Sequence, residues 1–399
     1  MEIKKNLYPI KFIPVAMEKP WGGNALIKKL GKEFVECDED GNEVKLTSGD
    51  KIGESWEMSD MGFVDSVVAN GWLAGNTFEE IMETYFERIV GEDVYQYYGR
   101  QFPVLVKFLD IQGRMSVQVN PDDEIAGQRY DTLGKCKFWY IMDAAPDARI
   151  YMGFKQEISA RELYDRCRDG SITDAMNAIS PRKGDSLLIR PGTVHSAEGG
   201  LLIAEIQESS DMTFRLFDWG RENNPATARP MHLEEAFDII DMGQYDSTGY
   251  RKGPLWGKDA SASAAGTHSG TDVTETLASV PQFTVNGIKV HEPLEISTEH
   301  FGSFLIYICI EGGADIQFPS VNGDGRKCTE SCRLGKGETV LIPADMPDFF
   351  IVPLDRDTSL LEVMIERREE IDSYINPDTE PYLEGEDYGG AEDEDNDDQ

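Results

Sequence analysis

The segment that decides the fold is GDSLLIRPGTVH, residues 184–195, which has the pattern of a turn, a short apolar strand, a second turn and a histidine. The segment GETVLIPADMP, residues 337–347, repeats this order with one residue fewer. Such an internal echo indicates two copies of one structural unit. The first copy ends at His195, whereas the second ends at Pro347, which cannot bind a metal. We therefore expect two related β-barrels, with the active site in the first and a structural role for the second.

Short apolar runs punctuated by Gly, Pro and Asp make up most of the chain around these two segments. Their length and spacing predict a mainly β protein, built as sandwiches or jelly-roll barrels. The clearest runs are residues 104–109, 138–142, 187–189, 201–206, 304–310, 340–342 and 360–365.

Helical patterns are few, and they fall in the first 240 residues. Thr77 is a predicted N-cap, with Glu80 at the capping-box position and an apolar face behind it. A second helix is expected to begin at Ser159, and a third to cover residues 233–240. The few helices should therefore be attached to the N-terminal barrel.

The length of 399 residues allows two domains of ordinary size. We expect an N-terminal domain at residues 1–248 and a C-terminal barrel at residues 280–370. Residues 249–279, rich in Gly, Ser, Ala and Thr, are predicted to be a linker or loop insertion. Residues 371–399 form an acidic tail, a composition typical of solvated, disordered chain.

The net charge of −36 limits the kinds of partner that the protein can bind. It argues against nucleic acid, which requires basic patches, and against an anionic membrane surface. A phosphorylated ligand requires local Lys and Arg side chains that overcome the global field. No secretory signal or membrane-length apolar run is evident. The six cysteines are scattered, and Cys328 and Cys332 have no second pair to complete a zinc site. Reduced thiols and a cytoplasmic location are expected.

Five polar residues around the first barrel are candidates for a site. Gln118 and Asn120 lie two apart at a strand end and should share a face, where their amide oxygens are weak ligands for a hard cation. Lys135 and Lys137 also share a strand face, and in a cavity they would attract phosphate or stabilise an anionic intermediate. His195 follows a Pro-Gly-Thr-Val turn. For each residue an ordinary structural or solvated role is the alternative.

Arg215 lies in the segment of residues 205–219, a polar turn between two strands. It is a candidate contact for an anion, and an ordinary surface ion pair is the alternative.

Seven segments occur in an order that resembles the class I phosphomannose isomerases of the short bacterial kind. The resemblance covers the first 240 residues well and the C-terminal barrel more loosely. It implies two cupin barrels, zinc as cofactor and the interconversion of mannose 6-phosphate and fructose 6-phosphate. The segments are EKPWGG (18–23), IGESWEMS (52–59), FPVLVK (102–107), SVQVNPDDE (116–124), GKCKFWY (134–140), PGTVH (191–195) and TFRLFD (213–218).

The resemblance also implies a set of zinc ligands, two of which are altered. In the family, zinc is held by a Gln, a His two residues later, a Glu and a second His. Gln118 and His195 match this set, whereas Asn120 and Lys137 replace the first His and the Glu.

The residues that support the zinc site in the family are kept. Lys135 matches the family's lysine, and Arg215 looks like the arginine of the catalytic pocket. We therefore predict Lys135 and Arg215 as catalytic residues and Gln118 and His195 as metal ligands, with zinc bound weakly or absent.

Three functional hypotheses follow. The chain is an active mannose-6-phosphate isomerase, a non-catalytic paralogue that binds a sugar phosphate, or a structural cupin without ligand. An ammonium about 4 Å from a dication is repelled by about 8 kcal/mol at an effective dielectric of about 20, so Lys137 favours the second hypothesis over the first. The retention of Gln118, Lys135, His195 and Arg215 argues against the third.

Overall fold

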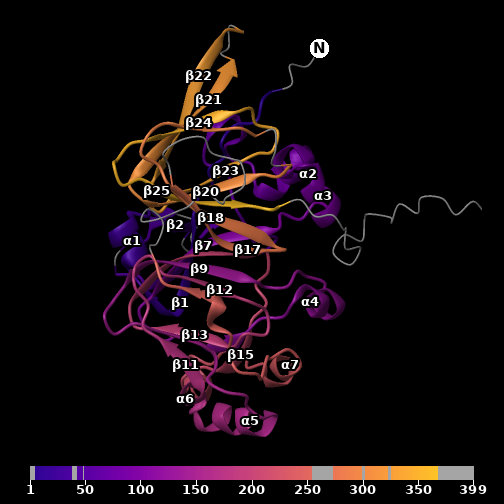
Figure 1. The fold of residues 1–399 in the computed structure, drawn as a ribbon, viewed down its shortest axis with the longest axis vertical. Helices are drawn as coiled ribbons and strands as arrows, with labels where there is room; N and C mark the ends of the chain where they lie inside the picture. Colours follow the sequence, from indigo (N-terminus) through magenta and orange to yellow (C-terminus); the bar gives the residue numbers. More distant parts are fainter. Residues whose placement is uncertain are drawn as a thin grey trace, which may run out of the picture.

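The computed structural model of the protein describes residues 5–37, 43–47, 49–253, 273–298, 302–321 and 325–366. The chain forms two double-sheet units that lie one above the other along the longest axis (Figure 1). Strands predominate in both units, as the apolar runs predict. The fold is therefore mainly β, with a cupin-type jelly-roll architecture, and each predicted barrel consists of two sheets.

The N-terminal unit contains a seven-stranded and a five-stranded sheet. Apolar side chains from both sheets, among them Trp139 and Ile150, pack in one cluster between them. The larger sheet has the order β1 (Val15–Gly23), β4 (Ile52–Met58), β7 (Val104–Ile111), β14 (Leu201–Glu208), β9 (Lys137–Ala144), β12 (Ser186–Ile189) and β16 (Tyr250–Arg251). The smaller sheet has the order β11 (Met176–Ile179), β10 (Arg149–Phe154), β13 (His195–Glu198), β8 (Val117–Val119) and β15 (Phe214–Phe217).

The C-terminal unit repeats this arrangement with five and four strands. The echo recognised in the sequence is visible here, because β12 pairs with β9 in the first unit and β23 pairs with β20 in the second. One sheet has the order β17 (Val273–Val280), β18 (Phe283–Lys289), β25 (Ser359–Met364), β20 (Leu305–Glu311) and β23 (Thr339–Ile342). The other has the order β19 (Leu294–Ile296), β24 (Phe349–Pro353), β21 (Gly313–Val321) and β22 (Lys327–Gly335).

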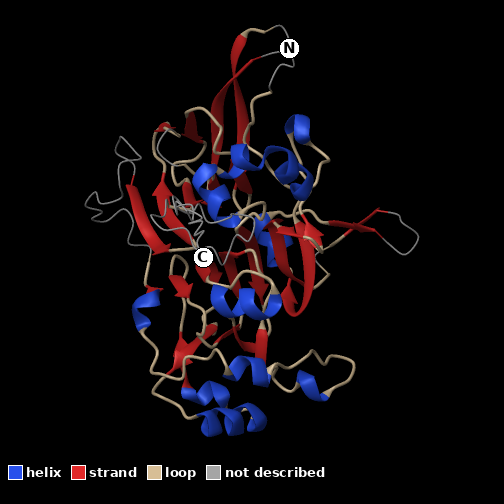
Figure 2. Cartoon of the chain, turned by 90° about the vertical axis from the view of Figure 1, so that its right-hand side faces the viewer, coloured by secondary structure: helices blue, strands red, loops and turns tan. Residues whose placement is uncertain are grey.

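The described helices lie outside the sheets (Figure 2). The predicted capping box is present at α2 (Phe78–Val90), where Thr77 Oγ1 accepts from the Glu80 amide at 3.2 Å and the Thr77 amide donates to the Glu80 carboxylate at 2.9 Å. Ser159 caps α5 (Ala160–Asp169) as predicted. The others are α1 (Ala25–Leu30), α3 (Glu92–Tyr98), α4 (Asp123–Tyr130), α6 (Ile172–Ala175) and α7 (Leu233–Phe237), the last being three residues shorter than predicted.

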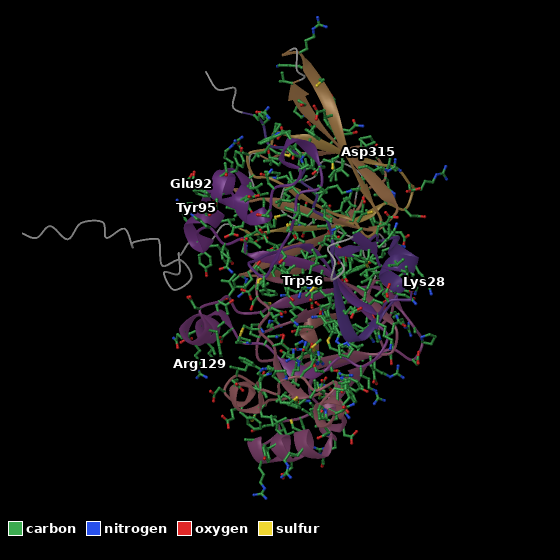
Figure 3. All side chains as sticks on the ribbon, turned by 180° about the vertical axis from the view of Figure 1, so that it is seen from behind. Lys28, Trp56, Glu92, Tyr95, Arg129 and Asp315 are labelled. Atoms are coloured by element: carbon green, nitrogen blue, oxygen red, sulfur yellow. The ribbon has the colours of Figure 1, made fainter. Side chains whose placement is uncertain are left out.

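Segments from the start of the chain also contact the C-terminal unit. Ile10 forms an isolated β-bridge with Leu341, and the amide of Ala344 donates to the carbonyl of Ile89 at the end of α2. Arg88 forms an ion pair with Asp345 at 2.6 Å. The first of the predicted helices, α2, therefore also covers part of the C-terminal unit. Trp56 is fully buried, whereas Lys28, Arg129 and Asp315 lie at the outside (Figure 3).

The predicted linker at residues 249–279 is partly wrong. Tyr250–Arg251 pairs with β12, and Val273–Val280 forms a strand that pairs with β18 along its whole length. The Thr and Ser residues of this stretch suit a loop, but its Thr and Val residues also favour an edge strand. Residues 254–272 and the acidic tail at 371–399 lie outside the described part of the chain.

Free cysteines are found at positions 136, 167, 309, 328 and 332. Among the helices that the structure describes, none is long and apolar enough to cross a membrane.

Candidate functional site

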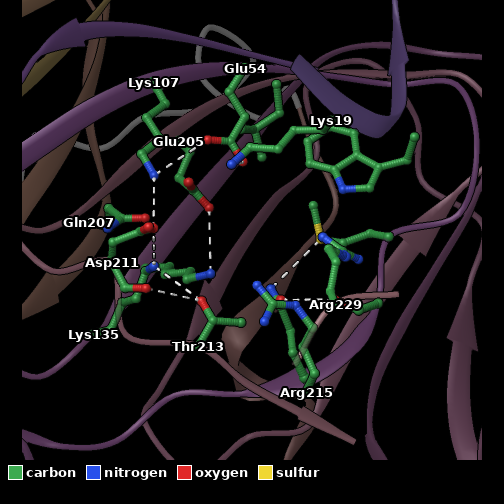
Figure 4. Close-up of a pocket in the computed structure, with 16 residues that line it drawn as sticks. Lys19, Glu54, Lys107, Lys135, Glu205, Gln207, Asp211, Thr213, Arg215 and Arg229 are labelled. Carbon is green, nitrogen blue, oxygen red and sulfur yellow. Dashed lines mark hydrogen bonds and ion pairs between the residues drawn. The ribbon is translucent and has the colours of Figure 1, made fainter. Parts of the chain in front are cut away.

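A polar pocket opens in the N-terminal unit, between side chains of both sheets (Figure 4). Of the described residues, six cationic and three acidic side chains line it, so its local formal charge is +3 in a chain of net charge −36. The lining residues are Lys19, Trp21, Glu54, Lys107, Leu109, Met115, Ser116, Gln118, Lys135, Lys137, Glu205, Gln207, Asp211, Thr213, Arg215 and Arg229. This is the local positive field that an anionic ligand requires.

Lys107 comes from the middle of β7, a strand that is buried along its full length. Its ammonium lies 3.7 Å from Glu54 and 3.9 Å from Asp211, and 4.0 Å above the ring of Trp56. A buried ammonium requires such partners because desolvation is costly. Lys107 and Lys19 together hold the pKa of Glu54 below its usual range, although burial acts in the opposite direction.

Lys135 shares Asp211 with Lys107. The Lys135 ammonium lies 3.5 Å from the Asp211 carboxylate and 3.5 Å from Thr213 Oγ1. Burial, with the nearby charge of Lys137, lowers the pKa of Lys135 to about 7. Burial raises the pKa of Asp211, but the three lysines around it outweigh this effect and lower the pKa to about 2.

Lys137 is the first residue of β9, and only 4% of its side chain is exposed. Its ammonium lies 3.9 Å from the carboxylate of Glu205, which also accepts a 2.6 Å hydrogen bond from the indole N–H of Trp139. Burial lowers the pKa of Lys137, and the charge of Glu205 partly opposes this shift.

His195 and Gln118 are direct partners in the pairing of β13 with β8. The Nδ1 atom of His195 lies 2.9 Å from the carbonyl oxygen of Thr193, which fixes that nitrogen as the donor. Nε2 therefore accepts from the Gln118 amide at 3.3 Å. Burial, then the charge of Lys137, lowers the pKa of His195 well below its usual value. The imidazole is accordingly neutral, and the lone pair of Nε2 accepts the hydrogen bond from the Gln118 amide.

A cluster of arginines completes the pocket. Asp218 is fully buried and accepts from Arg229 at 2.6 and 3.0 Å and from Arg221 at 2.5 Å. Arg215 faces Gln118 across the pairing of β15 with β8. Its Nη1 donates to the carbonyl of Pro230 at 3.3 Å, and its buried Nε atom has no partner in the structure.

The structure brings together most of the predicted site residues. Gln118, Lys135, Lys137 and Arg215 line one pocket, and His195 lies behind Gln118 rather than on the pocket wall. Asn120 is not among the lining residues. Its amide donates to the carbonyl of Met212 at 2.7 Å, and its buried Oδ1 has no hydrogen-bond partner in the described part of the chain.

Sequence reasoning missed Lys107, Glu54 and Glu205 as site residues, although the sequence carries a signal for them. Each is one of two charged residues in a largely buried strand, and a buried charge requires a partner or a function. The local sequence around Arg229 and Asp218 does not mark them as site residues. A loop brings Arg229 back to the pocket, where it pairs with Asp218.

The chain is similar to a known protein family. The profile of the type I phosphomannose isomerase catalytic domain matches residues 10–154. YvyI of Bacillus subtilis, whose name assigns it to the mannose-6-phosphate isomerases, is 30% identical over 344 residues, which cover 86% of this chain and 95% of YvyI. The chain belongs to the type I phosphomannose isomerase family.

Three further proteins are similar to the chain in sequence or in fold. Mannose-6-phosphate isomerase ManA of Bacillus subtilis is 32% identical over 235 residues, which cover 59% of this chain and 68% of ManA. The crystal structure of the mannose 6-phosphate isomerase from Bacillus subtilis superposes with a TM-score of 0.71 at 27% identity, covering 90% of this chain and 99% of that chain. A zinc-bound mannose 6-phosphate isomerase shares the fold, with a TM-score of 0.64 at 13% identity.

The residues at the four expected ligand positions do not fit zinc. Gln118 and Asn120 supply only neutral amides, and Lys137 supplies a cation. The nitrogen of His195 that could bind a metal accepts a hydrogen bond from Gln118. Within the described ranges, no group of three or more His, Cys, Asp or Glu side chains could hold a metal ion. Zinc sites in proteins require about three such ligands.

Proposed function

We propose that this member of the phosphomannose isomerase family binds a sugar phosphate in the pocket around Lys135 and Arg215, without zinc and without the zinc-dependent isomerisation. The observation that carries the proposal is the position of Lys137. Its buried ammonium lines the pocket at the position where the resemblance implies a carboxylate ligand for zinc.

The charge of the pocket supports an anionic ligand. The described lining residues carry a local charge of +3, and four of the six cations are lysines with a carboxylate within 4 Å. These carboxylates partly oppose the burial that lowers the pKa of Lys135 and Lys137. A ligand with a phosphate group brings further negative charge to a site that has a positive excess.

The loss of zinc removes the electrophile of the family's reaction. In aldose–ketose isomerisation a metal ion stabilises the developing oxyanion while acid–base groups move the proton. Lys137 keeps a positive charge near this place. A single ammonium is a weaker electrophile than a dication, and here Glu205 lies 3.9 Å from it and offsets part of its charge.

A second candidate function is isomerisation of mannose 6-phosphate to fructose 6-phosphate without a metal. One observation favours it, namely the pKa of Lys135 at about 7, which suits a group that exchanges protons at neutral pH. Lys137 and Lys107 would then stabilise the oxyanion.

One set of measurements separates these functions. Protein purified without chelator is assayed for zinc by elemental mass spectrometry, for binding of mannose 6-phosphate by calorimetry, and for conversion to fructose 6-phosphate. We expect binding without stoichiometric zinc and turnover far below 1 per second, the lower end of common enzyme rates. Turnover at or above that rate would establish the isomerase instead. A protein that binds neither mannose 6-phosphate nor fructose 6-phosphate would refute both functions.

A matched pair of variants tests whether the pocket is the binding site. Lys135→Met removes a pocket cation, whereas Arg129→Ala removes an exposed cation that pairs with Asp238 on the surface, outside the pocket. We expect the first variant alone to lose affinity for mannose 6-phosphate. Equal affinity in both variants would show that the ligand binds elsewhere.

A further inference from the structure

The pocket has two cationic ends that differ in how their charges are balanced. Figure 4 shows Arg215 and Arg229 side by side, apart from Lys107 and Lys135. At the lysine end each ammonium has a carboxylate within 4 Å, as the ion pairs of Lys19, Lys107, Lys135 and Lys137 show.

At the arginine end one carboxylate serves several guanidinium groups. Asp218 binds both Arg229 and Arg221, and among the described residues Arg215 forms no ion pair with any carboxylate. Among the residues that the structure describes, the buried Nε–H of Arg215 has no acceptor. The arginine end therefore has the larger excess of positive charge and an unsatisfied donor. Planar guanidinium groups also match the oxygens of a phosphate better than lysine does.

The backbone around Asp218 is held in an unusual conformation. Trp219 has a φ of +59°, in the left-handed region that non-glycine residues rarely adopt, and Gly220 follows with +83°. The Trp219 indole donates to the carbonyl of Met115 at 2.6 Å, and the guanidinium of Arg114 lies 4.7 Å from its ring. Strain of this kind persists where the surroundings fix it, and it is common at functional sites. Trp219 directly follows Asp218, whose carboxylate binds Arg229 and Arg221.

From these observations we infer that Arg229 is a phosphate-binding residue that acts beside Arg215, and that Asp218 is a positioning residue that holds the Arg229 guanidinium toward the pocket. This inference rests on the proposed function and specifies the direction of the ligand. The phosphate group lies at the arginine end, and the sugar carbons lie toward Lys135 and Lys137.

The test uses the full chain with mannose 6-phosphate as the probe. Calorimetry measures the affinity, and a ³¹P NMR titration measures the pKa of the bound phosphate. The second ionisation of a phosphate monoester has a pKa near 6. Two neighbouring guanidinium groups favour the dianion, so we expect this pKa to be lowered in the complex. Arg229→Ala should weaken binding about 10- to 100-fold, as expected for lost charged hydrogen bonds, and should raise the pKa of the bound phosphate.

Further variants separate positioning from folding. Asp218→Asn keeps the shape but removes the charge that aligns Arg229, so it should shift affinity and phosphate pKa in the same direction as Arg229→Ala. Arg229→Lys should recover part of the affinity and part of the lowered phosphate pKa that Arg229→Ala loses. Arg221 is the other partner of Asp218 and does not line the pocket. Arg221→Ala should therefore lower the affinity for mannose 6-phosphate much less than Arg229→Ala. Urea unfolding of each variant identifies those that fail to fold.

The outcomes distinguish this inference from the function on which it rests. If the unmodified protein binds no sugar phosphate, the proposed function fails. If it binds and Lys135→Met moves the pKa of the bound phosphate while Arg229→Ala does not, the phosphate lies at the lysine end and the inference is overturned. An equal loss in Arg221→Ala and Arg229→Ala would show that the arginine cluster acts only in folding.

Discussion

Exchange of Lys137 for glutamate should destabilise the metal-free protein, because the new carboxylate would face Glu205. The Lys137 ammonium lies 3.9 Å from the Glu205 carboxylate, and 4% of each side chain is exposed. Two like charges at that separation repel by about 4 kcal/mol at an effective dielectric of about 20. Lys137→Gln is the matched control, since it removes the ammonium without adding a charge. At pH 7 we expect Lys137→Glu to be less stable than Lys137→Gln by up to about 4 kcal/mol.

The pH dependence of this difference has a definite sign. Repulsion raises the pKa of the paired carboxyls in the folded state, so the folded state binds more protons than the unfolded one near neutral pH. Stability of Lys137→Glu is therefore higher at low pH and is lost as pH rises through the raised pKa. Urea unfolding in chelator at pH 5 and pH 7 measures the difference. Equal stability of the two variants at pH 7 would refute the coupling to Glu205.

Zinc should reverse this loss only when a second ligand is supplied. Lys137→Glu adds a carboxylate, and Asn120→His adds an imidazole two residues after Gln118. Together with His195 they would give three strong ligands, the number typical of catalytic zinc. Zinc affinity and stability measured for the unmodified chain, both single variants and the double variant should be strongly non-additive. Stoichiometric, tight zinc in Lys137→Glu alone would show that Asn120 is not limiting.

Three further predictions test the site and the fold. The unmodified protein should hold well under one zinc per chain after purification, and a tightly bound equivalent would contradict the ligand argument. The pKa of Lys135 is lowered from 10.5 to about 7, so the unfolded state binds more protons between these values and stability should rise with pH across this window. Lys135→Met should lack this rise in urea unfolding at pH 7 and 9.5, and a variant with the unmodified slope would refute the shift. Thr77→Ala should cost about 1 kcal/mol through the lost cap of α2, whereas Thr84→Ala within that helix should cost less; equal costs would argue against the capping box.

Much of the fold could be predicted from the sequence because its signals lie within short segments. The capping box needs only Thr77 and Glu80, and the echo of residues 184–195 at 337–347 needs only the order of turn, strand and proline. The strand Val273–Val280 was missed because its Thr and Ser residues suit both a loop and an exposed edge, and only pairing with β18 decides between them. Propensity is weak where tertiary pairing determines the structure.

The candidate site could be predicted in part. Gln118, Lys135, Lys137 and Arg215 line the pocket, as the strand periodicity and the family resemblance suggested. The partners that set their charge states come from distant segments, and no spacing rule connects them. Glu205 lies opposite Trp139 across a strand pair, and Asp211 follows the end of β14. Burial sets the direction of the pKa shifts of Lys135 and Lys137, and these two tertiary neighbours partly oppose it.

The retention of His195 and Gln118 has an explanation that needs no metal. The imidazole donates through Nδ1 to Thr193 and accepts through Nε2 from Gln118, so both ring nitrogens are satisfied inside a fully buried position. Loss of either partner would leave a buried polar group unpaired, which costs about 1 to 3 kcal/mol. Asn120 and Lys137 have no such reciprocal bond with this pair. The two residues that match the family's ligands therefore bind each other, whereas Asn120 and Lys137, at the two altered positions, have other partners.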